Sequence, residues 1–160
     1  MVDITAGDSR GPTGYGAGMT DASGATITGI HHFSPTVRDV EVSAAWYEKV
    51  FSMIRIPITL AHHEREETGY AVLMMDPVSG LVIGLHHNEA NEGEPFDEAH
   101  TGLDHIGFLV PSRASLDEWV TKLDGLGVEH SGIRDLTEPV PFSTLVFRDP
   151  DNIQLELVHQ

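Results

Sequence analysis

The chain has 160 residues, of which 40% are hydrophobic, and it contains no cysteine. This length suits one domain with its own core. Its 25 acidic against 9 basic residues give a net charge of -16, which argues against nucleic acid or an anionic membrane as partner, because both attract basic patches. The lack of cysteine excludes disulfides and thiolate chemistry, and no apolar run could span a bilayer. We therefore expect a soluble, cytoplasmic protein.

The first half of the chain reads as a tail followed by alternating elements. Residues 1–25 hold 6 of the 16 glycines and show no helical or strand period, which predicts a disordered tail. A strand over 26–37 precedes a helix that begins at the N-cap Asp39. Further strands are predicted at 53–63, 69–76 and 80–87, and the acidic residues 89–101 form a solvated linker.

The second half shows the same order of elements. A strand begins near Leu103, with His105 on one face and Phe108 on the other. The next helix carries a capping box formed by Ser115 and Glu118, and Gly127 ends it. Three more strands are predicted near 128–134, 142–148 and 152–159.

A shift of 73 residues superimposes one half on the other. His32 then falls on His105, and the Asp-Pro pair at 76–77 falls on the pair at 149–150. After a one-residue gap, Gly84 falls on Glu156. A repeat of two copies predicts an α+β fold of two paired βαβββ modules. Each helix should cover one sheet face, which leaves the histidine-bearing face to line a cleft.

The stretch DPDNIQLELVH at 149–159 joins a turn to an alternating strand. Pro, Asp and Asn are typical of turns. In the strand, Leu155 and Leu157 share one face and Glu156 points to the other. A carboxylate in an otherwise apolar strand needs a partner if it is buried. The alternative is a solvent-facing side chain on a one-sided sheet.

The sequence resembles the vicinal oxygen chelate superfamily of glyoxalases, bleomycin-resistance proteins and extradiol dioxygenases. The resemblance is carried by the segments GIHHFSPTVRDVEVSAAWYEKVF, GLVIGLHH, GLDHIGFLV and FRDPDNIQLELV. It implies one domain over 26–159, with module one at 26–88, the linker at 89–101 and module two at 102–159. The implied fold is a U-shaped mixed sheet around a cleft, with helices on the outer faces and metal ligands on the first and last strands of each module.

The resemblance also implies a ligand set. His32 and His105 match the first-strand ligands and Glu156 matches the last-strand ligand of module two. Gly84 stands where glyoxalase-like members carry Glu or Gln, so a two-histidine, one-carboxylate set with open positions remains for Fe, Mn, Ni or Zn. His86 lies two residues beyond Gly84 and is expected to be a further ligand or a general acid or base, and Glu156 is the other candidate base.

Three function classes are compatible with these residues. The first is a metal-dependent enzyme whose divalent ion chelates vicinal oxygens of a small-molecule substrate, with dioxygenase or lyase/isomerase chemistry. The second is a metal-free small-molecule binding protein of the bleomycin-resistance kind, and a third possibility is a degenerate module kept for structure or assembly. A homodimer is expected from the resemblance. Whether the modules pair within one chain or between two chains is left open.

Overall fold

The computed structural model describes residues 27 and 29–160, so the predicted tail of residues 1–25 lies outside the described residues. His31–Gln160 forms one compact unit. Its elements are β1 (His32–Phe33), α1 (Val40–Phe51), β2 (Ile54–Ala61), a 3-10 turn η1 (Glu66–Thr68), β3 (Gly69–Met75), β4 (Val82–Asn88), β5 (His105–Leu109), α2 (Arg113–Leu126), β6 (His130–Leu136), β7 (Phe142–Arg148) and β8 (Gln154–His159). None of the helices in these ranges is long and apolar enough to cross a membrane.

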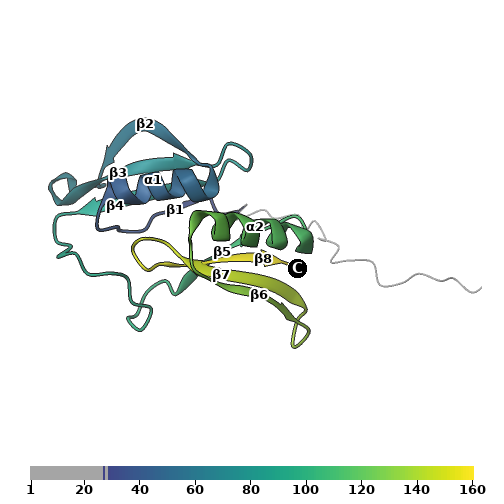
Figure 1. Cartoon of the computed structure of the whole chain (residues 1–160). Helices are drawn as coiled ribbons and strands as arrows, with labels where there is room; N and C mark the ends of the chain where they lie inside the picture. Colours follow the sequence, from purple (N-terminus) through teal and green to yellow (C-terminus); the bar gives the residue numbers. More distant parts are fainter. Residues whose placement is uncertain (1–26, 28) are drawn as a thin grey trace, which may run out of the picture. The chain divides into compact units, whose positions relative to one another are not determined.

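The elements form two modules of identical topology, which confirms the predicted α+β fold. One four-stranded sheet has the order β1-β4-β3-β2 and the other has the order β5-β8-β7-β6 (Figure 1). In each sheet the first and last strands of the module pair in parallel, and the remaining pairs are antiparallel. The strands that carry the candidate ligands therefore lie next to each other in each module.

The helix ends follow local chemistry. The Asp39 carboxylate accepts hydrogen bonds from the amides of Glu41 and Val42, which confirms Asp39 as the N-cap of α1. The predicted cap of α2 is wrong by one turn, because Ser112 is the N-cap and its hydroxyl accepts from the Ser115 amide. Gly127 ends α2 in the left-handed conformation, as predicted, where the lack of a side chain removes the steric cost.

Strand β1 is much shorter than the predicted strand over 26–37. Pro35 has no amide hydrogen, so a regular ladder cannot continue through it. The chain instead makes separate contacts with β4, in which the His86 amide donates to the Pro35 carbonyl and the Val37 amide donates to the His86 carbonyl. These bonds keep the segment after β1 beside β4 up to the start of α1.

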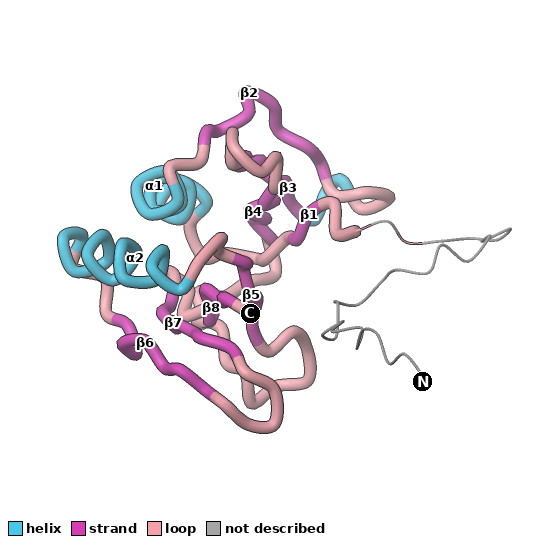
Figure 2. Tube along the Cα trace, turned by 90° about the vertical axis from the view of Figure 1, so that its right-hand side faces the viewer, coloured by secondary structure: helices cyan, strands magenta, loops and turns pink. Residues whose placement is uncertain are grey.

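One hydrophobic core joins the two modules. Helices α1 and α2 touch each other and lie side by side (Figure 2). Phe51 of α1 packs against Phe108 and Trp119 of module two, with ring centroids 5.3 Å and 5.5 Å away. Trp46 packs against the same core, so both tryptophans belong to the packing. The histidine-bearing faces of the sheets are turned away from this core.

Candidate metal centre

His105 and Glu156 come together in module two. They project from the paired strands β5 and β8, and His105 Nε2 lies 3.6 Å from Glu156 Oε2. The His105 side chain is 42% exposed and the Glu156 side chain 19% exposed, whereas Leu155 and Leu157 are buried. Glu156 thus stands on the face opposite the core, as the alternation predicts, and the histidine beside it there is His105.

Both side chains are oriented by a second residue. The Asp104 carboxylate accepts a hydrogen bond from His105 Nδ1 at 2.5 Å. Because Nδ1 carries the hydrogen, the lone pair of neutral His105 is on Nε2, the atom nearest Glu156. On the other side, the Thr144 hydroxyl donates to Glu156 Oε1 and leaves Oε2 for another partner. A histidine held by a carboxylate through its second nitrogen is the usual arrangement around metal ligands.

The repeat is visible at the level of single register pairs. His32 pairs with Val82 in the β1–β4 ladder, and His105 pairs with Gln154 in the β5–β8 ladder. Two residues further along each last strand lie Gly84 and Glu156. The register therefore supports the one-residue gap in the repeat and places Gly84 at the position of the missing carboxylate.

The space beside Gly84 belongs to Ser34. A Cβ built on Gly84 would lie 2.5 Å from Ser34 Oγ, so the serine occupies the volume that a side chain at Gly84 would need. In module two the roles are reversed, because Gly107 leaves open the space that Glu156 enters. Module one therefore presents histidines without a carboxylate on the matching strand.

The third predicted ligand, His32, lies in module one on the exposed strand β1, where its Nδ1 is 2.8 Å from His31 Nδ1. Across residues 27 and 29–160, no three side chains of His, Cys, Asp or Glu are grouped closely enough to hold a metal ion. The chain by itself thus brings together two of its three predicted ligands, and His32 is not beside them.

His86 lies on the same sheet face as His32 and Gly84. Its Nε2 is 3.6 Å from the Cβ position of Gly84, so the ring points back along β4 toward that residue. Burial, together with the nearby His62 and His32, holds the pKa of His86 below its usual value. A histidine of lowered pKa is neutral at pH 7 and has a lone pair for a proton or a metal ion.

A cavity of about 230 Å³ lies next to His105. Its wall combines apolar side chains with hydroxyl groups and comes from both modules and the linker: Phe33, Ser34, Pro35, Thr36, Phe96, Leu103, Asp104, His105, Ile106 and Ile153. A small, partly apolar molecule can lie there with one end at the histidine.

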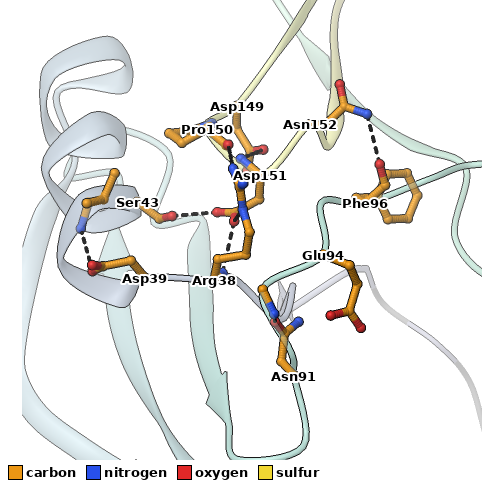
Figure 3. A network of polar contacts seen from close by, with 12 residues as sticks. Arg38, Asp39, Ser43, Asn91, Glu94, Phe96, Asp149, Pro150, Asp151 and Asn152 are labelled. Carbon is orange, nitrogen blue, oxygen red and sulfur yellow. Dashed lines mark hydrogen bonds and ion pairs between the residues drawn. The ribbon is translucent and has the colours of Figure 1, made fainter.

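The turn before β8 has a role that the sequence did not reveal. The Asp151 carboxylate, 4% exposed, accepts from the amide and Nε of Arg38 and from the Ser43 hydroxyl, all in module one (Figure 3). The linker joins the same turn, because the side-chain Nδ2 of Asn152 donates to the Phe96 carbonyl and the backbone amide of Phe96 donates to the Asp151 carbonyl. The shared Asp-Pro motif was a signal of the turn but not of this long-range contact.

Residues 29–157 match the family model of the Glyoxalase/Bleomycin resistance protein/Dioxygenase superfamily. The chain belongs to this superfamily. The resemblance predicted from the sequence is therefore confirmed, and the two modules seen here are the fold that it implied.

Individual members of the superfamily are similar over most of the chain. The chain is 26% identical to "Putative ring-cleaving dioxygenase MhqA" of Bacillus subtilis over 82% of its length, but it spans only 40% of that protein. It is 29% identical to "Metallothiol transferase FosB" of Bacillus licheniformis, covering 82% of this chain and 75% of FosB. The crystal structure of a glyoxylase/bleomycin resistance protein/dioxygenase domain from Frankia sp. EAN1pec matches with a TM-score of 0.71 and 30% identity, over 83% of this chain and 92% of that chain.

Proposed function

We propose that this protein is a metal-dependent enzyme in which His105, Glu156 and His32 hold a divalent ion that chelates two neighbouring oxygens of a small-molecule substrate. The observation that carries the proposal is the His105–Glu156 pair, with a nitrogen lone pair and a carboxylate oxygen 3.6 Å apart. Asp104 and Thr144 orient these two groups from behind.

The donor set suits a divalent ion better than a structural role. A purely structural role would give little stability here, because ion pairs of His105 with two carboxylates on an exposed face contribute little. The bond from His105 Nδ1 to Asp104 is instead the arrangement that orients a metal ligand. Two imidazoles and one carboxylate are ligands for Fe, Mn, Ni and Zn, and such a set leaves positions open for substrate.

We propose that His32 reaches the ion from a second copy of the chain in a homodimer. His32 is exposed on one module and His105 is 42% exposed on the other. The histidine-bearing face of module one also exposes Ile58 and Leu60, each about half accessible. Apolar side chains on an open sheet face favour cover by another protein surface. A second copy would bury these residues and complete the ligand set.

The ion would supply Lewis-acid stabilisation of a bound enolate or, as iron(II), activation of dioxygen. The protein residues have separate tasks. Neutral His86, on the face of His32, accepts a proton from a substrate hydroxyl, because its pKa is held low by burial and by neighbouring histidines. The cavity beside His105 takes the apolar part of the substrate and excludes water from that side.

Between the two reaction types, we favour ring-cleaving dioxygenase chemistry. Two histidines and one carboxylate form the set used by non-haem iron oxygenases, and the relative MhqA carries a ring-cleaving dioxygenase name. Lyase or isomerase chemistry of the glyoxalase type is less suited, because Gly84 replaces a residue that resembles its fourth ligand or base.

The decisive experiment measures metal content in protein purified without chelators, for the wild type and for His32→Ala and His105→Ala. We expect about one ion per chain in the wild type and loss in both variants. Mixing the two variants should restore uptake at one site per mixed dimer if the ligands come from two chains. Wild-type protein that takes up no Fe(II), Mn(II), Ni(II) or Zn(II) would instead identify the metal-free binding protein of the bleomycin-resistance kind.

A further inference from the structure

A second pair of histidines lies in module one, away from the His105–Glu156 pair. His62 follows β2 and His86 lies on β4, and their ring centroids are 5.0 Å apart with planes inclined by 31°. Gly69 makes room for this approach, because a Cβ there would lie 3.0 Å from His62 Cε1 and only 2.1 Å from the His87 carbonyl oxygen. The glycine thus allows the His62 ring to lie against the strand backbone.

The hydrogen bonds of His62 fix where its lone pair lies. The Thr68 hydroxyl donates its only hydrogen to the Arg65 carbonyl oxygen, so it has none left to donate to His62. The 2.8 Å contact between His62 Nδ1 and Thr68 Oγ1 must then be a bond donated by Nδ1. Neutral His62 therefore keeps a lone pair on Nε2. This atom is buried and has no hydrogen-bond partner among the described residues.

The two rings have a separation that a shared ion would require. Ring contacts without an ion also occur at 5.0 Å, so the unpartnered lone pair of His62 Nε2 is what favours an ion here. Two imidazoles bound through nitrogen to one tetrahedral ion, with metal–nitrogen distances of about 2.0 Å, have centroids roughly 5 Å apart. His62 also has the second-nitrogen hydrogen bond that metal-binding histidines usually make, here to Thr68.

We infer that His62 and His86 form a two-imidazole site for a late first-row transition ion, Cu(II), Ni(II) or Zn(II), separate from the proposed centre at His105 and Glu156. Water completes the coordination, because His62 and His86 are both only partly buried. An ion there would occupy the lone pair that the proposed proton transfer needs, so it would inhibit that chemistry. Binding of the ion does not depend on the proposed function.

The test uses Cu(II) as probe, because it binds imidazole most tightly of these ions. The full-length chain, stripped of metal, carries His105→Ala and Glu156→Ala so that the proposed centre cannot contribute. We expect one Cu(II) to remain bound per chain, with electron paramagnetic resonance splitting from two imidazole nitrogens. Adding His62→Gln should weaken binding at least tenfold and remove one nitrogen coupling. Adding Thr68→Val, which removes the orienting hydroxyl, should weaken it about tenfold.

The matched control is His63→Gln, because His63 is the adjacent histidine and its side chain is 94% exposed. This variant should bind Cu(II) as the parent does. Equal affinity in the His62→Gln and His63→Gln proteins, with circular dichroism showing both folded, would overturn the inference. So would the absence of Cu(II) binding once His105 and Glu156 are removed. If only the proposed function is wrong, the result is different: metal uptake would be the same in the wild type and in His105→Ala.

Discussion

Gly107 and Glu156 face each other in the β5–β8 register, and a Cβ on Gly107 would lie 3.6 Å from Glu156 Oε2. In module one the small and the larger residue have changed places, because Ser34 lies over Gly84. Only one member of each facing pair can extend into this space. The duplicated modules thus differ in which strand supplies the polar group, and module two alone presents a carboxylate beside its first-strand histidine.

This relationship predicts the cost of filling Gly84. Gly84→Ala should lower the free energy of unfolding by about 1 kcal/mol, because the new methyl group forces Ser34 Oγ to rotate away. The Ser34→Ala/Gly84→Ala double variant should recover most of that loss. Gly107→Ala is the control, since its methyl group meets Glu156 only at ordinary contact distance. Urea denaturation of the wild type and the three variants measures the free energies of unfolding. Equal losses in Gly84→Ala and Gly107→Ala would contradict the argument.

The Asp104–His105 bond predicts the effect of a change next to the ligands. Asp104→Asn replaces a charged acceptor by a neutral amide. This weakens the hydrogen bond that keeps the hydrogen of neutral His105 on Nδ1. We expect metal affinity to fall 10- to 100-fold with little change in melting temperature. Calorimetric titration with Zn(II) measures the affinity. Asp97→Asn, on the exposed linker, serves as control, and an unchanged affinity in Asp104→Asn would exclude the orienting role.

Asp149 predicts a pH dependence of stability. Burial raises the pKa of its carboxyl from 3.8 to about 6, against opposing hydrogen bonds from the Ile153 amide and Tyr47. The folded state thus favours the neutral acid. The stability from this group is fully present below about pH 4 and is lost as the pH rises through about 6. A shift of about two pKa units corresponds to roughly 3 kcal/mol.

The variant Asp149→Asn isolates this effect, because the amide stays neutral and its Nδ2 can donate to the Tyr47 oxygen. We expect it to match the wild type near pH 4 and to be more stable by up to about 3 kcal/mol at pH 7. Urea denaturation of both proteins from pH 4 to 8 gives the difference curve. A variant that is less stable than the wild type at pH 7 would show that the ionised carboxylate stabilises the fold.

The contact between the modules predicts a large effect of one aspartate. Asp151→Ala removes the acceptor of the Arg38 amide and the Ser43 hydroxyl and leaves both polar groups without it. We expect the free energy of unfolding to fall by about 2–4 kcal/mol. Asp135→Ala breaks an exposed ion pair with Arg113 and should change stability far less. Similar effects of both variants in thermal unfolding would argue against a special role for Asp151.

The sequence predicted what depends on local pattern and on the repeat. Alternation in β8 placed Leu155 and Leu157 in the core and Glu156 outside it. The 73-residue shift, with its one-residue gap, placed Gly84 at the position in module one that is equivalent to Glu156. The N-cap of α2 was placed wrongly because Ser112 and Ser115 are both residues that cap helices, and the choice between them depends on the backbone conformation after Pro111. Strand β1 was overestimated because its regular ladder with β4 does not continue through Pro35, beyond which only an isolated bridge between Thr36 and His86 remains.

Contacts between distant residues could not be predicted in this way. Nothing in the spacing of His62 and His86 indicates that Gly69 lets their rings approach, or that Thr68 fixes the His62 tautomer. Likewise, whether His32 meets His105 depends on how the modules of one or two chains pair, which the spacing does not indicate. The ligand set implied by the resemblance stays a prediction until metal binding is measured.

The Asp151 contact also bears on how the protein is made. Residues Arg38 and Ser43, which belong to the first module to be synthesised, find their acceptor more than 100 residues later in the chain. Until that turn emerges from the ribosome, the start of α1 has polar groups that only water can satisfy. Module one is therefore expected to remain incomplete during translation, and the two modules should become stable together rather than one after the other.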